Sequence, residues 1–170
     1  MTTRLATRKL KTKFGEFIEI LYSDGHGESI ALVLGDVRGK AEVLCRIHSA
    51  CIGGHVFNSI ECDCAAEMAA AQSAIQDAGR GVIIYLDQEG KGNGHLALML
   101  SIPFKEAGSS QSEAYEKAGY APDARTYDPV AKILNALEVR SIILLTDSSK
   151  KAEELKKLGV DVSDTRTLAK

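Results

Sequence analysis

Short apolar runs separated by turn signals fill the first third of the chain and predict β-strands. Residues 29–35 (SIALVLG) are rich in β-branched and other apolar side chains, and residues 41–48 (AEVLCRIH) alternate between polar and apolar positions. Ser23-Asp24-Gly25 and Gly35-Asp36 mark turns between these runs. We therefore expect a β-rich segment from about residue 7 to 48.

The pattern then changes to alternating helices and strands. Residues 65–78 (AAEMAAAQSAIQDA) are good helix formers, and Gly79 suits a C-terminal cap. Residues 81–86 (GVIIYL) and 141–146 (SIILLT) are short enough and apolar enough to be buried strands. The remaining predicted elements are a helix over 95–107 interrupted at Pro103, a helix that begins with Asp128 as N-cap and Pro129, a capped helix over 148–158, and a last strand over 160–162.

This order of elements predicts an α/β fold. We expect a mixed sheet with an N-terminal β-rich part and alternating helices and strands after it. The chain has 170 residues, shows no internal repeat or linker, and has an ordinary length for one domain. We therefore predict a single domain over residues 1–170.

Composition narrows the classes of function. Hydrophobic residues make up 45% and charged residues 26% of the chain, as in ordinary soluble proteins. The net charge of -2 and the lack of a basic stripe argue against nucleic acid as a partner. No apolar run approaches the roughly 20 residues of a membrane span, and the N-terminal segment lacks the hydrophobic core of a signal peptide. We expect a cytoplasmic protein without a membrane partner.

The chain has four cysteines, and three of them, Cys51, Cys62 and Cys64, fall within fourteen residues. In a cytoplasmic chain such a cluster indicates metal binding or catalysis rather than disulfides, whereas Cys45 lies in an apolar run and reads as a buried thiol. Zinc prefers thiolates, and three protein ligands with an open position would activate water for hydrolysis. Two alternatives stay open: three unrelated thiols, or a closed site with His48 or His55 as fourth ligand.

Several short motifs, taken together, resemble the GTP cyclohydrolase II family. They are 46–51 (RIHSAC), 62–64 (CDC), 88–91 (QEGK), 119–125 (GYAPDAR), 144–146 (LLT) and Lys150-Lys151. Their order and spacing match the family's from about residue 10 to 163.

The resemblance implies a reaction and a set of residues. The family opens the imidazole ring of GTP and releases formate and pyrophosphate, leaving a diaminopyrimidinone ribosyl phosphate, the first intermediate of riboflavin synthesis. It implies Zn²⁺ on Cys51, Cys62 and Cys64, Asp123 as proton acceptor and Arg125 as nucleophile. It also implies Mg²⁺ with the polyphosphate and a homodimer. The implied guanine-nucleotide contacts are Arg46, Ile47, His48, Ser49, Ala50, Glu67, Glu89, Gly90, Lys91, Gln111, Thr146 and Lys151.

The residue types suit this chemistry, with alternatives. Chemistry at phosphorus depends on positioning and on cations, and the Gly-rich stretch 88–94 could add backbone N–H groups or be a plain turn. Glu89 could accept the N1 and N2 protons of guanine. Because the free pKa of arginine exceeds 12, Arg125 could stabilise charge instead of acting as a nucleophile. Asp123 and Arg125 could also be a plain ion pair on a loop.

The chain departs from the family pattern near the predicted site. Ala50 and His55 stand where the family has carboxylates, Glu67 replaces glutamine, Lys91 replaces arginine, and Ile102 replaces a tyrosine. Two alternatives follow. One is a specialised-metabolism paralogue with an altered nucleotide substrate or a product that retains its formyl group. The other is a non-catalytic, zinc-stabilised nucleotide-binding module.

Overall fold

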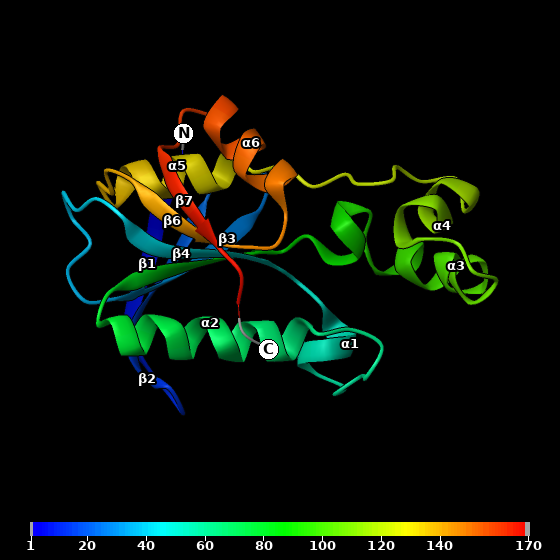
Figure 1. The fold of residues 1–170 in the computed structure, drawn as a ribbon, viewed down its shortest axis with the longest axis horizontal. Coiled ribbons are helices and arrows are strands. Elements are labelled where there is room, and N and C mark those ends of the chain that lie inside the picture. Colours follow the sequence, from blue (N-terminus) through cyan, green and yellow to red (C-terminus); the bar gives the residue numbers. More distant parts are fainter. Residues whose placement is uncertain (1, 169–170) are drawn as a thin grey trace.

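The fold is built on one mixed sheet. A computed structural model describes residues 2–168 and, within them, places seven strands in the order β1-β2-β3-β5-β4-β6-β7 (Figure 1). Neighbours from β1 to β5 pair antiparallel, and neighbours from β5 to β7 pair parallel. This confirms the predicted α/β class. The strands are β1 (Thr3–Thr12), β2 (Gly15–Ser23), β3 (Glu28–Leu34), β4 (Val43–Ser49), β5 (Gly81–Leu86), β6 (Ile142–Leu145) and β7 (Val162–Arg166).

Helices cover both faces of the sheet. The helix α2 (Cys64–Ala78) lies along one face, and α5 (Asp128–Ala136) and α6 (Ser149–Lys157) lie on the other (Figure 1). Successive strand residues point to opposite faces, so Ile83 joins the core under α2 while Ile84 joins the core under α5 and α6. Both faces of β5 are thereby buried, which explains its continuous apolar sequence.

A two-helix lobe extends beyond one end of the sheet. The helices α3 (His95–Glu106) and α4 (Gln111–Lys117) pack against each other there, and the short helix α1 (Ile52–His55) lies at the same end (Figure 1). The chain leaves β4, β5 and β6 at this end, which is where ligands gather in α/β folds. Within the described residues, no helix is both long and apolar enough to cross a lipid bilayer.

The buried strands and the strongest helices lie where the sequence predicts them. The predicted helix over 65–78 is α2, and Gly79 ends it in the left-handed conformation with φ of 69°. The hydroxyl of Ser148 caps α6 by accepting a hydrogen bond from the backbone N–H of Lys151. Cys45 is fully buried, as predicted.

Three local predictions are wrong. Asp128 is the first residue of α5 rather than its N-cap, which is Tyr127. Pro103 does not interrupt α3, which continues past it to Glu106. The last strand is Val162–Arg166 rather than 160–162. That strand is an edge of the sheet with mostly exposed side chains, so it carries no apolar alternation.

Two helices were not predicted, and the Gly-rich stretch takes the turn that was one of its two expected forms. The helix α1 is only four residues long, and the Gly-rich stretch forms a 3₁₀ turn, η1 (Glu89–Gly92). The helix α4 does carry a sequence signal: Ser110 and Glu113 form a reciprocal capping box at its start.

Candidate functional site

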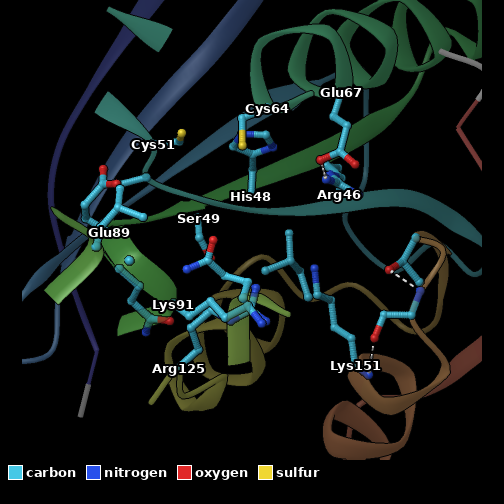
Figure 2. Close-up of a pocket in the computed structure, with 18 of the residues that line it drawn as sticks. Arg46, His48, Ser49, Cys51, Cys64, Glu67, Glu89, Lys91, Arg125 and Lys151 are labelled. Atoms are coloured by element: carbon cyan, nitrogen blue, oxygen red, sulfur yellow. Dashed lines mark hydrogen bonds and ion pairs between the residues drawn. The ribbon is translucent and has the colours of Figure 1, made fainter. Parts of the chain in front are cut away.

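The carboxyl ends of β4, β5 and β6 meet at a cavity of about 440 Å³ between the sheet and the two-helix lobe (Figure 2). All the nucleotide contacts expected from the resemblance line this cavity, and so do Cys51, Cys64 and Arg125. Cys62 and Asp123 do not line the cavity themselves, but each contacts a residue that does. Residues far apart in the sequence therefore converge on one site.

The three clustered cysteines form a compact set of thiols. Their Sγ atoms lie within 4.8 Å of one another, and the Sγ atoms of Cys51 and Cys62 are 3.5 Å apart. A tetrahedral zinc site with metal–sulfur bonds of about 2.3 Å has edges of roughly 3.8 Å. The spacing of the thiols therefore fits a zinc ion.

Gly54 leaves the room that this cluster needs. A Cβ atom at this position would lie 2.9 Å from Cys62 Sγ and 3.4 Å from Cys51 Sγ, so any larger residue would push the thiols. The backbone N–H of Gly54 also donates to Cys51 Sγ, at 3.4 Å. Gly54 thus both makes space for the thiols and orients one of them.

The thiols differ in their readiness to ionise. Burial works against ionisation of Cys62, but hydrogen bonds from the backbone of Cys64 and from the other two thiols outweigh it and lower the pKa of Cys62. Burial raises the pKa of Cys51 and of Cys64. Cys62 precedes the start of α2, where helix N–H groups stabilise a thiolate.

His48 and His55 bind each other rather than the thiols. Their Nε2 atoms share a hydrogen bond of 2.9 Å, and burial together with Arg46 and His55 lowers the pKa of His48 to about 3. Among the described residues, the group of candidate metal ligands contains the three thiols and neither histidine. A closed site with a histidine as fourth ligand is therefore not supported.

Arg46 is a buried cation in the middle of β4. Its Nη1 donates to the backbone oxygen of Leu145 at 3.0 Å, and its Nη2 is ion paired with Glu67 Oε2 at 2.6 Å (Figure 2). Glu67 lies one helical turn after Cys64 on α2. The sequence pointed to both residues but gave no sign that they pair.

Lys151 and Thr146 lie where β6 ends and α6 begins. Burial, with repulsion from Arg46 and Arg125, lowers the pKa of Lys151 to about 8. Thr146 is buried, and its Oγ1 accepts a hydrogen bond of 3.1 Å from the backbone N–H of Ser148. This loop therefore brings a partly desolvated ammonium group to the cavity.

The Gly-rich stretch is a turn in which several backbone N–H groups are hydrogen-bonded to carbonyl groups of the same turn. The N–H groups of Gly92, Asn93 and Gly94 donate to carbonyl groups within the turn, so these three cannot cradle a phosphate as the sequence suggested. Lys91 has a φ of 54°, and its Nζ donates to Ser112 Oγ at 2.9 Å. The side chain of Lys91, rather than these backbone groups, supplies the positive charge here.

The segment that carries Asp123 and Arg125 packs directly on this turn. A Cβ atom on Gly92 would lie 2.8 Å from the backbone carbon of Ala124, whose N–H donates to the Lys91 oxygen at 2.9 Å. Close contact between the two backbones requires glycine, and it holds Asp123 and Arg125 beside Lys91.

Asp123 and Arg125 form a bidentate ion pair. Arg125 Nε donates to Asp123 Oδ1 at 2.9 Å, and Nη2 donates to Oδ2 at 2.5 Å. Burial opposes ionisation of Asp123, yet the hydrogen bonds and charge of Arg125 lower the pKa of Asp123. The hydrogen bond from Arg125 to Asp123 in turn raises the pKa of Arg125. Both groups are therefore held in their charged forms.

Glu89 is buried, and one of its oxygens is already used. Its Oε2 accepts a hydrogen bond of 2.7 Å from the backbone N–H of Ile52, the first residue of α1. Its Oε1 lies 4.0 Å from His95 Nδ1. Glu89 thus orients the segment that begins at Cys51 and keeps a single oxygen for other contacts.

Sequence reasoning missed several residues of the wall. The buried Tyr115 on α4 is the largest of them, and the capping box that starts this helix was the signal that could have placed it. The other cavity-lining residues that were not predicted are Gln88, Leu98, Asp147 and Ser148.

Comparison with known proteins identifies the family. The family model of GTP cyclohydrolase II matches residues 3–167. The chain belongs to the GTP cyclohydrolase II family. GTP cyclohydrolase-2 of Shewanella amazonensis is 38% identical over 160 residues, which cover 93% of this chain and 78% of that protein. Riboflavin biosynthesis protein RibBA of Bacillus cereus is 40% identical over 95% of this chain and 41% of its own length.

A solved structure shares the fold. RibBX of A. baumannii, a two-domain 3,4-dihydroxy-2-butanone 4-phosphate synthase, superposes with a TM-score of 0.54 over 99% of this chain and 40% of its own. At 16% identity this likeness concerns the fold alone. Membership of the GTP cyclohydrolase II family, which consists of metalloenzymes, rests on the family match and the closer relatives.

The structure gives the bonding partner or the burial of each position at which this chain departs from the pattern expected for the GTP cyclohydrolase II family. His55 is bonded to His48, Glu67 to Arg46, and Lys91 to Ser112. Ala50 is buried and lines the cavity. Ile102 is half-buried on α3 and is not part of the cavity wall.

Proposed function

We propose that this chain catalyses the zinc-dependent opening of the guanine imidazole ring of GTP, releasing formate and pyrophosphate to give a diaminopyrimidinone ribosyl phosphate. One observation carries the proposal: the same cavity is lined by two of the three clustered thiols, Cys51 and Cys64, and by Arg125, which is ion paired with Asp123. The family supports a guanine nucleotide as substrate.

The reaction consumes three water molecules, and each of them cleaves a different bond. One water adds at C8 and breaks the bond from C8 to a ring nitrogen, a second cleaves the resulting formamide to free formate, and a third cleaves the bond between the α- and β-phosphates. Cys51, Cys62 and Cys64 would hold the zinc ion, which supplies Lewis acidity for hydrolysis when it is bound. The base would therefore lie at the cysteine end of the cavity.

The cations would hold the phosphates at the other end. Lys91, Arg125 and Lys151 line the cavity, and the charge of each would offset charge on a phosphate group. Mg²⁺ would accompany the polyphosphate. Because the pKa of Arg125 is raised by its bond to Asp123, we assign it charge stabilisation at phosphorus rather than nucleophilic attack.

The decisive experiment is incubation of zinc-loaded protein with GTP. Loss of the purine absorbance, together with formate and pyrophosphate in equal amounts, is the expected result. The Cys62→Ser variant should lose zinc and activity together, while Cys45→Ser, which removes a thiol outside the cluster, should keep both. Full zinc occupancy without any change in the purine spectrum would contradict the proposal.

A product that retains its formyl group is the second candidate. It comes from the sequence, where Ile102 is an apolar residue at the position at which the resemblance expects a tyrosine, although Ile102 does not line the cavity. Mass spectrometry of the product decides between the two, because the retained formyl group adds one carbon and one oxygen. Free formate in amounts equal to consumed GTP would exclude this second candidate.

A further inference from the structure

Tyr115 places a phenol on the cavity wall that the proposed chemistry does not use. Tyr115 is 1% exposed, and it lies on α4, on the side of the lobe that lines the cavity. No hydrogen-bond partner for its hydroxyl occurs among residues 2–168. The hydroxyl is not among the polar atoms that are sealed from solvent without a partner, and Tyr115 lines the cavity, so its hydroxyl is free to bond a ligand there.

The position of this hydroxyl along the cavity follows from its neighbours. A Cβ atom on Gly90 would lie 3.3 Å from Tyr115 Oη, so the hydroxyl lies against the residue between Glu89 and Lys91. One helical turn earlier, Ser112 accepts the hydrogen bond of Lys91 Nζ. In Figure 2, Glu89 lies on the cysteine side of the cavity wall, and Lys91 and then Arg125 follow it along the wall.

In the orientation given under the proposed function, this midpoint would correspond to the sugar of a bound nucleotide. With the base at the cysteine end and the phosphates near Lys91 and Arg125, the ribose lies between them. Burial and the carboxylate of Glu89 raise the pKa of Tyr115 to about 12, although Arg125 opposes the shift. The phenol therefore stays neutral at physiological pH and can both donate and accept a hydrogen bond.

We propose that the Tyr115 hydroxyl binds a hydroxyl group of the substrate ribose and so selects ribonucleotides over deoxyribonucleotides. The proposal rests on the orientation given under the proposed function. It assigns Tyr115 a role in specificity, through direct contact with a part of the substrate that does not react.

The test compares GTP, 2′-deoxy-GTP and 3′-deoxy-GTP in the zinc-loaded wild type and in Tyr115→Phe, which removes only the oxygen. We expect the wild type to favour GTP over one of the two analogues by about 2- to 13-fold, the range for one neutral hydrogen bond. Tyr115→Phe should lose that same factor with GTP and none with that analogue. Both kcat/KM and the dissociation constant from calorimetry should show the effect.

Tyr22→Phe is the matched control, because it removes a phenol that is buried in the sheet core and does not line the cavity. It should leave all three nucleotides unchanged. Equal losses for all three nucleotides in Tyr115→Phe, no loss for any, or a wild type that does not distinguish them would overturn the proposal. If calorimetry shows the expected selectivity while no ring is opened, the sugar contact stands and the proposed reaction fails.

Discussion

Arg46 and Glu67 form an ion pair of 2.6 Å on the wall of the cavity. The Arg46 side chain is only 9% exposed, so solvent screens the pair weakly, whereas Glu67 at 26% is more open. Glu67 comes one helical turn after Cys64. A carboxylate beside the metal-binding segment thus neutralises a cation that a polyanionic substrate would otherwise meet.

Replacing Glu67 by glutamine should strengthen the binding of GTP. The substitution keeps the shape of the side chain but removes one negative charge from the cavity, so Arg46 becomes available to phosphate. We expect the KM for GTP to fall about fivefold and that for GMP to fall less, because GTP carries more charge. Steady-state kinetics at constant ionic strength measures both values.

Asp77→Asn is the control for this change, since it removes one charge from the exposed far end of the same helix. It should leave both KM values unchanged. A Glu67→Gln variant that binds GTP more weakly would show instead that the carboxylate helps to bind the substrate.

Gly54→Ala should weaken metal binding. The added methyl group would meet Cys62 Sγ at 2.9 Å, so the thiols must move apart. We expect a loss of zinc affinity of about 10- to 100-fold, as for other residues that orient metal ligands. Competition with a chromogenic chelator measures this loss.

Gly53→Ala is the neighbouring control, because a Cβ there meets only Ser59, at the ordinary distance of 3.6 Å. Its zinc affinity should match that of the wild type. Equal zinc affinity in the two variants would show that the thiols are not confined as the structure places them.

The activity should fall on the alkaline side with the titration of Lys151. Its pKa of about 8 means that it is mostly charged at pH 7 and mostly neutral at pH 9. Loss of this charge weakens phosphate binding, so kcat/KM, which reports the free enzyme, should decline above pH 8. A pH profile of kcat/KM measures the decline.

Lys151→Arg should move this decline to higher pH, because arginine keeps its charge throughout the range. Lys150→Arg changes the exposed neighbour and should leave the profile as it is. If the profile of Lys151→Arg coincides with that of the wild type, another group controls the alkaline limb.

Substitutions of Arg125 should separate charge stabilisation from nucleophilic attack. Arg125→Ala should lower pyrophosphate release by about 10²–10³-fold, as when one preorganised donor is lost. Arg125→Lys keeps the charge and loses the bidentate contact with Asp123, so we expect a smaller loss of about tenfold. Pyrophosphate and formate are quantified separately in each variant.

A guanidinium nucleophile would predict equal losses in the two variants, since neither retains the attacking nitrogen. Zinc content should stay at the wild-type level in both, because Arg125 does not contact the thiols in the structure. A loss of zinc in either variant would mean that the lowered activity reports damage to the site rather than the role of Arg125.

Much of the fold followed from local patterns. The apolar runs that became β5 and β6 and the alanine-rich segment that became α2 were found because burial and helix propensity act over a few residues. The strand β7 was misplaced because an edge strand with exposed polar side chains leaves no apolar alternation to detect. The start of α5 was misassigned because Asp is favoured both at the N-cap and in the first turn of a helix.

By itself, the sequence determined which residue types could do the chemistry: the clustered thiols, the cations and the motifs that identify the family. Only the tertiary structure decided their partners, namely Glu67 on Arg46, His55 on His48 and Tyr115 against Gly90. The physical reason is the separation along the chain over which each kind of interaction acts. Propensity and side-chain periodicity act between neighbours in the chain, whereas these contacts join segments brought together by the parallel strands and the packing of the lobe, and no local pattern records that distance.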